Sequence, residues 1–262
     1  DITIGGSGTV VSCKTGSAVH SVRFHPTADN ITLLAHPKTV DVWDCATQQR
    51  IIETSATDHM QNVYSAAWSF NGTGFVTTCK DKIVRLFDSR SGSCEATTMG
   101  HGSWRPSIAV WLDREKTFMT TGHASDMSRE VLVWDIRALT KHVTKKRVDS
   151  GSSVLMPLAD TDTGLISLTS RGDSGLRIWH YNSSASSPAK ALKEIINSRL
   201  GGDPVLDTCF LPKGACDIQG CEMARVLRLT QKSIDPVRVE LPRRDQSRID
   251  QEIFVDTCSR AA

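Results

Sequence analysis

The sequence has no long hydrophobic run and no excess of charge of one sign. No stretch approaches the roughly 18 apolar residues that a membrane-spanning helix requires, so we expect no transmembrane segment. Basic residues number 31 and acidic residues 29, which gives a net charge of +2. A nucleic-acid-binding protein carries a clear basic excess, so nothing here points to a nucleic-acid partner. The chain starts at Asp1, without Met or a signal segment, which suggests a processed chain or a piece of a longer one.

Metal-site spacing is also missing among the eight cysteines. Cys209, Cys216 and Cys221 form a loose cluster, whereas a zinc site usually contains a pair two to four residues apart. No histidine lies near the cluster in sequence. An even number of cysteines permits disulfides, but a chain of this length has no need of them. We therefore expect mostly buried, reduced thiols and no metal or other cofactor, and the role of the cluster stays open.

A repeat of about 45 residues organises the chain. An apolar run that ends in an aromatic residue occurs four times, at Trp43, Phe87, Trp134 and Trp179, and Asp follows the first three. The aromatic residues are 44, 47 and 45 positions apart. This period with a Trp-Asp motif is typical of β-propeller blades of the WD-repeat kind. Between the aromatic residues, short β-branched runs and hairpin signals such as 71–74 predict about four strands per repeat.

The fold prediction is therefore all-β: a WD-repeat β-propeller with about five blades. An α-solenoid or an α/β fold would need long helices, and the runs rich in Val, Ile and Thr favour strands. Residues 189–196 fit either a helix or a strand, and we favour the strand because a blade needs a fourth one. The whole chain, 1–262, is taken as one partial propeller. Its repeats lie at about 10–58, 59–100, 101–148 and 149–188, with a last blade and extension at about 189–262.

Four polar residues lie in phase with the repeats. His59 and His101 precede two of the units, and Asp81 and Asp173 stand six residues before an aromatic residue. In WD-repeat proteins a loop histidine bonds to an aspartate in a hairpin turn. Tight turns between buried strands leave polar groups that must find partners without water. We therefore expect these four residues to act as structural locks.

Several stretches resemble the coronin family. The most specific are Phe210–Gly214, Cys221–Arg225 and Val239–Arg244, a run that other WD-repeat proteins lack. Two repeats depart from the pattern, since Pro37 and Ser128 stand where the turn aspartate is expected. A complete lock is therefore predicted only for the second repeat. Similar but less specific stretches are Val22–Asn30, Asn71–Arg85, Arg105–Glu130 and Gly172–Arg177.

The resemblance has implications for architecture and function. Coronin propellers have seven blades, so this chain matches about the C-terminal two-thirds and the N-terminal blades are missing. The resemblance implies a cytoplasmic, cytoskeleton-associated scaffold that binds actin filaments and Arp-complex machinery. The alternative is a coronin-related adaptor in Golgi or endosomal trafficking or in ubiquitin-ligase recruitment. Oligomerisation is expected only if a coiled coil exists outside this chain.

The candidate partner-binding residues are basic or aromatic. Trp104 and Arg105 lie in a loop between blades, and Trp and Arg contribute most to protein interfaces, although a loop Trp can also fold under its own blade. The basic residues suit an acidic partner surface such as actin, although such residues can equally belong to a solvated loop. The candidates are Trp104, Arg105, Lys80, Lys82, Lys145, Lys146, Arg147, Arg243 and Arg244.

An enzymatic function is not expected. Residues 172–175 read Gly-Asp-Ser-Gly, which resembles the nucleophile segment of trypsin-like proteases. Catalysis would also require an oriented histidine and a buried aspartate. The segment lies in phase with the repeats, where Asp173 already has a turn role, so we interpret it as structural.

Overall fold

The computed structural model describes residues 14–241 apart from 56, 115, 186 and 218. The described strands form five antiparallel sheets, in each of which consecutive strands are neighbours. The first contains β1 (Ser21–Phe24), β2 (Ile31–Ala35), β3 (Val40–Asp44) and β4 (Gln49–Glu53). The second contains β5 (Val63–Trp68), β6 (Gly74–Cys79), β7 (Ile83–Asp88) and β8 (Cys94–Met99). The third contains β9 (Ile108–Trp111), β10 (Thr117–His123), β11 (Arg129–Asp135) and β12 (Thr144–Asp149).

The other two sheets complete the described chain. The fourth contains β13 (Leu155–Asp160), β14 (Leu165–Ser170), β15 (Gly175–Tyr181) and β16 (Leu192–Arg199). The fifth contains β17 (Asp207–Phe210), β18 (Glu222–Leu229) and β19 (Ile234–Glu240). Three single-turn helices lie between strands: η1 (Ile136–Ala138), α1 (Pro188–Ala191) and η2 (Lys213–Ala215).

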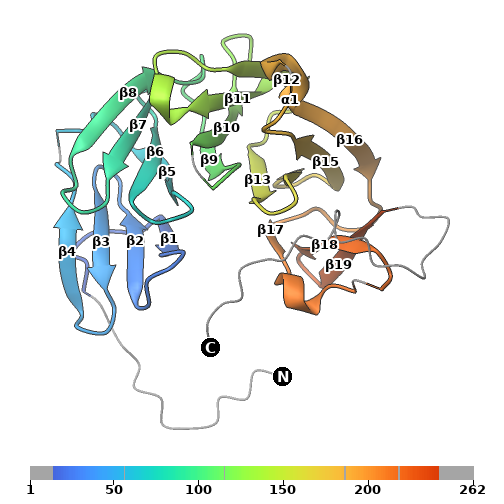
Figure 1. Cartoon of the computed structure of the whole chain (residues 1–262), viewed down its shortest axis with the longest axis horizontal. Helices are drawn as coiled ribbons and strands as arrows, with labels where there is room; N and C mark the ends of the chain where they lie inside the picture. Colours follow the sequence, from blue (N-terminus) through green and yellow to red (C-terminus); the bar gives the residue numbers. More distant parts are fainter. Residues whose placement is uncertain (1–13, 56, 115, 186, 218, 242–262) are drawn as a thin grey trace, which may run out of the picture.

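The sheets are arranged as blades around a common axis (Figure 1). The first strands of successive sheets, β1, β5, β9, β13 and β17, contact one another in that order, so they line the centre. The described part of the ring is open between the first and fifth sheets. This confirms the prediction of an all-β propeller with about five blades.

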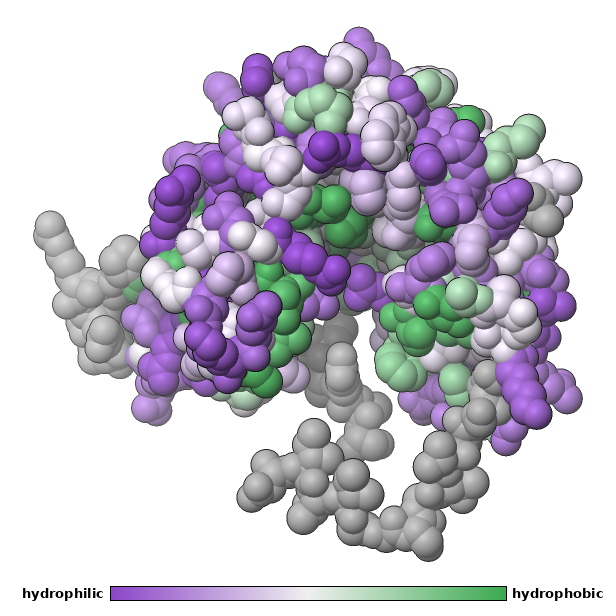
Figure 2. Space-filling model, turned by 180° about the vertical axis from the view of Figure 1, so that it is seen from behind, coloured by the Kyte–Doolittle hydropathy of each residue, from purple (hydrophilic) through white to green (hydrophobic). Residues whose placement is uncertain are grey.

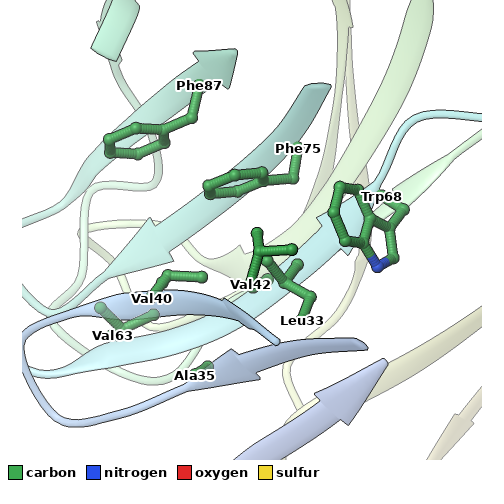
Figure 3. Packing of buried hydrophobic residues seen from close by; sticks show 9 residues of the cluster. Leu33, Ala35, Val40, Val42, Val63, Trp68, Phe75 and Phe87 are labelled. Carbon is green, nitrogen blue, oxygen red and sulfur yellow. The ribbon is translucent and has the colours of Figure 1, made fainter. Parts of the chain in front are cut away.

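The core consists of a hydrophobic seam between each pair of adjacent sheets. In the first seam, Leu33 and Val42 pack against Phe75 and Phe87 (Figure 3). The two phenyl rings are nearly parallel, with centroids 5.1 Å apart and an interplanar angle of 9°. Both side chains are fully buried, and burying each one contributes about 1.5–3 kcal/mol.

The repeated aromatic residue occupies the same place in the first three seams. Phe87 pairs with Phe75 across β6 and β7, and Trp134 pairs with Phe118 across β10 and β11. Trp179 likewise pairs with Ile166. In the second, third and fourth sheets the 45-residue period therefore reflects one buried aromatic side chain per sheet, packed toward the preceding sheet.

The ambiguous segment is mostly strand. One helical turn, α1, precedes β16, and β16 then pairs with β15 along its whole length. Pairing with an existing sheet satisfies the backbone groups of the segment, and this outweighs its local preference for a helix. The preference for a strand is confirmed from Leu192 onward.

Hydrophobic side chains remain exposed beside the opening of the ring. Val22 and Phe24 on β1 are 52% and 76% exposed, and Ile234 on β19 is 65% exposed. Figure 2 shows hydrophobic residues gathered on both sides of this opening. Within the described residues, no helix has the length and apolar character needed to cross a membrane.

Candidate functional site

A buried hydrogen-bond chain stabilises the third sheet. The Trp134 indole N–H donates to Thr120 Oγ1 (2.9 Å), and this hydroxyl bonds to His101 Nε2 (3.0 Å). On the other side of the ring, His101 Nδ1 lies 3.0 Å from Glu130 Oε1. The prediction that this repeat lacks an acid partner is wrong. The acid comes from strand β11 itself, because Glu130 reaches the histidine that Ser128 in the turn does not contact.

The same chain fixes the charge of Glu130. Burial by itself raises the pKa of this carboxyl group, but hydrogen bonds from His101 and Lys145 together hold it below its ordinary value. Lys145 Nζ lies 2.8 Å from Glu130 Oε2. One of the candidate partner-binding lysines is therefore engaged within the blade.

The second sheet has a different arrangement from the predicted His59–Asp81 bond. His59 is fully buried and bonds through Nε2 to Thr77 Oγ1 (3.0 Å). Asp81 instead receives the Arg85 guanidinium (2.6 Å to Oδ2) and the Ile83 N–H (2.9 Å to Oδ1). The predicted bond is wrong because the guanidinium group of Arg85, on β7, donates to both carboxylate oxygens of Asp81.

The fourth and first sheets also differ from expectation. Asp173 accepts the Gly175 N–H (3.2 Å) and so caps its own turn instead of bonding to a histidine. In the first sheet the structure reveals a buried pair that the sequence pattern did not predict: His36 Nε2 lies 3.2 Å from Asp41 Oδ2. The only sequence signal was an acid two residues before Trp43, inside the strand.

The exposed candidate residues gather around the loop between β8 and β9. Trp104 is 60% exposed. The Tyr64 hydroxyl donates to the Trp104 carbonyl (2.6 Å), which fixes the loop to the second sheet. The Lys80 ammonium lies 5.8 Å from the centre of the indole ring, within the range of a cation–π contact.

Two further bonds hold the same loop. Lys82 Nζ donates to the Gly102 carbonyl (2.8 Å), and Arg105 donates to the Ser152 carbonyl of the next inter-sheet loop. We call the residues Tyr64, Lys80, Lys82, Trp104 and Arg105 the Trp104 surface. Sequence reasoning named four of them, and Tyr64 was missed because nothing in the sequence places its hydroxyl against a loop 40 residues later.

Three other basic candidates do not join this surface. Lys145, Lys146 and Arg147 lie on β12, the last strand of the third sheet. Lys145 pairs with Glu130, Lys146 donates to the Leu192 carbonyl, and Arg147 lies 3.7 Å from Asp126. Arg243 and Arg244 lie outside the described residues.

Comparisons with known proteins agree with the fold and the repeats. No family model matches the sequence. Coronin-7 from Bos taurus is 33% identical over 242 residues, which cover 91% of this chain and 25% of that protein. Coronin-A from Dictyostelium discoideum is 31% identical over 204 residues, covering 78% and 44% of the two chains. The crystal structure of the WD40 domain from Toxoplasma gondii coronin superposes with a TM-score of 0.82 and 26% identity, over 90% of this chain and 59% of that one.

The sheets, their period and their seams define a WD-repeat β-propeller. Within that class, the sequence is similar to coronins over most of its length. This protein belongs to the coronin family. The chain spans about a quarter of the length of the Coronin-7 relatives that it matches.

Proposed function

We propose that this protein is a cytoplasmic, cytoskeleton-associated scaffold that binds actin filaments and Arp-complex machinery through the Trp104 surface. Membership of the coronin family supports the partner class. The observation that carries the proposal is the exposed indole of Trp104, held on a loop that Tyr64, Lys82 and Arg105 fix to neighbouring parts of the fold. The proposed action is binding alone, without a covalent step.

The geometry of this surface suits protein binding for two reasons. An exposed indole on a loop that is already ordered loses little conformational entropy when a partner covers it, and Trp and Arg dominate interface energies. Lys80 and Lys82 beside it add positive charge, which attracts an acidic partner surface and makes binding weaken as salt rises.

The test is co-sedimentation of the purified protein with actin filaments over a range of salt concentrations. We expect binding at low salt, weaker binding at high salt, and a loss of affinity of about tenfold or more for Trp104→Ala. Phe24→Ala, which removes another exposed aromatic side chain, is the matched control and should bind as the unaltered protein does. Protein that stays in the supernatant at low salt would refute the actin assignment. Equal binding of Trp104→Ala and the unaltered protein would refute the choice of surface.

The alternative, an adaptor in Golgi or endosomal trafficking or in ubiquitin-ligase recruitment, uses the same kind of surface. One observation favours keeping it: the Coronin-7 relatives extend well beyond the matched region, which covers only 25% of them. Failure to sediment with filaments, together with Trp104-dependent binding to a partner other than actin, would favour this alternative.

A further inference from the structure

A cavity of about 320 Å³ opens between the third and fourth sheets. In the second and third sheets, the matching position holds a lock histidine bonded to Thr77 or Thr120. The strand register of the fourth sheet places Leu168 where Thr77 and Thr120 stand in the other two. The hydroxyl partner of a lock histidine is therefore missing in the fourth sheet. The cavity walls carry charged and polar side chains, among them Arg129, Asp149, Ser170, Asp173, Arg177, Asn197 and Arg199.

Two arginines share one carboxylate at the base of this cavity. Arg129, which is only 4% exposed, donates through Nη2 to Asp149 Oδ2 (2.6 Å) and through Nε to Oδ1 (2.5 Å). Arg177 Nη2 donates to the same Oδ2 (2.8 Å). Asp149 stands 19 residues before Leu168, as His101 stands 19 before Thr120. The place of a lock histidine is thus taken by an ionic cluster of two arginines and one shared carboxylate.

The fourth sheet brings a third arginine to the same wall. In the pairing of β15 with β16, Arg177 is opposite Asn197 and Gly175 is opposite Arg199. Arg177 and Arg199 are therefore diagonal neighbours on one face, with Cβ atoms roughly 7–8 Å apart, and Gly175 places no side chain between them. Arg177 Nη1 lies 3.6 Å from Glu194 Oε1. Among the described residues, Arg199 forms no ion pair within 4 Å.

We propose that this cavity binds a phosphoryl group between Arg177 and Arg199. Two guanidinium groups that approach from adjacent strands can each donate to different oxygens of a tetrahedral phosphoryl group. Its charge of about −1.5 to −2 at pH 7 complements Arg199, which has no ion pair among the described residues, whereas Arg177 also faces Asp149 and Glu194. The polar side chains of Ser170 and Asn197 line the same space and offer neutral donors. A planar carboxylate suits the parallel fork of a single arginine, as Asp149 does with Arg129, better than two guanidinium groups on adjacent strands.

One acid in the wall opposes this ligand and provides a test of sign. Asp173 lines the cavity, and its Oδ1 accepts the Gly175 N–H at 3.2 Å. Its negative charge repels a phosphoryl group, while an asparagine in its place retains an oxygen that can accept the same bond. Asp173→Asn should therefore tighten binding.

The experiment is isothermal titration calorimetry of the purified protein with inorganic phosphate and with O-phosphoserine at constant ionic strength. Arg199→Gln should weaken binding about tenfold or more, since it removes a charge-assisted hydrogen bond. Asp173→Asn should strengthen binding. Arg90→Gln, which changes an exposed arginine in the β7–β8 turn of the second sheet, is the matched control and should leave the affinity unchanged.

The two ligands distinguish the source of the phosphoryl group. Tighter binding of O-phosphoserine supports a group carried on a partner side chain, and tighter binding of inorganic phosphate supports the free ion. The proposal is overturned if neither ligand binds saturably, or if Arg199→Gln binds as tightly as Arg90→Gln. Circular dichroism of each variant establishes that the sheets are retained, and Arg199 is exposed, so its replacement should not disturb folding.

Discussion

Acid should destabilise this propeller through His59. The side chain is fully buried, and burial, with a smaller contribution from the nearby positive charge of Arg85, lowers its pKa from 6.5 to about 4. In the unfolded chain the imidazole has its ordinary pKa of about 6.5. Between these two values the unfolded state therefore binds a proton that the folded state does not.

The sign and size of the effect follow from proton linkage. Because the folded pKa is the lower one, the full contribution of neutral His59 to stability is present above pH 6.5 and is lost as the pH falls toward 4. At 1.36 kcal/mol for each pKa unit, the difference between 6.5 and about 4 corresponds to a loss on the order of 3 kcal/mol. That is a large part of the stability of an ordinary domain.

The assay is urea denaturation followed by tryptophan fluorescence, at several pH values between 7 and 4. His59→Gln serves as the comparison, since it keeps a side chain that can bond to Thr77 but cannot titrate. Other groups that titrate in this range act on both proteins and cancel in the difference. The stability advantage of the unaltered protein should shrink by about 3 kcal/mol from pH 7 to pH 4. A difference that stays constant across this range would refute the reasoning.

Two further predictions concern the seams between sheets. Thr120→Val leaves the buried Trp134 and His101 nitrogens without their shared hydroxyl, so the free energy of unfolding should fall by about 2–4 kcal/mol in urea titrations. Thr120→Ser keeps the hydroxyl and should retain most of that free energy. Equal losses for both variants would contradict the hydrogen-bond argument. Phe75→Ala empties a fully buried site and should lower the free energy of unfolding by about 3–5 kcal/mol. Phe24 is 76% exposed, so Phe24→Ala should change the midpoint of thermal unfolding little. Similar losses of stability for both variants would contradict the assignment of the first seam to the core.

Much of the fold could be predicted from the sequence, because the repeat is a local pattern. Trp43, Phe87, Trp134 and Trp179 end strands at nearly constant spacing, and each fills the same position in its sheet. Strand alternation and hairpin turns depend on neighbouring residues only. The fold class and the approximate number of blades therefore followed from spacing alone.

The candidate site could be predicted only in part. Trp104, Arg105, Lys80 and Lys82 were singled out by residue type, and the structure brings them onto one loop and the adjoining turn. Their association depends on the β6–β7 turn, which carries Lys80 and Lys82, lying beside the β8–β9 loop, and on that loop lying beside the β12–β13 loop. The number of residues between these positions in the sequence does not predict that their side chains lie close together in space.

The sequence by itself determined where the strands and their buried aromatic residues lie, since those follow from periodicity along the chain. The tertiary structure decided which polar groups meet: Glu130 with His101, Arg85 with Asp81, and Arg129 and Arg177 with Asp149. The physical reason is that several side chains compete for each buried partner. The winner is the one whose strand position and length bring it within about 3 Å. Hairpin and strand geometry within a sheet sets that distance for Glu130, Arg85 and Arg129, and the packing of the fourth sheet against the third sets it for Arg177.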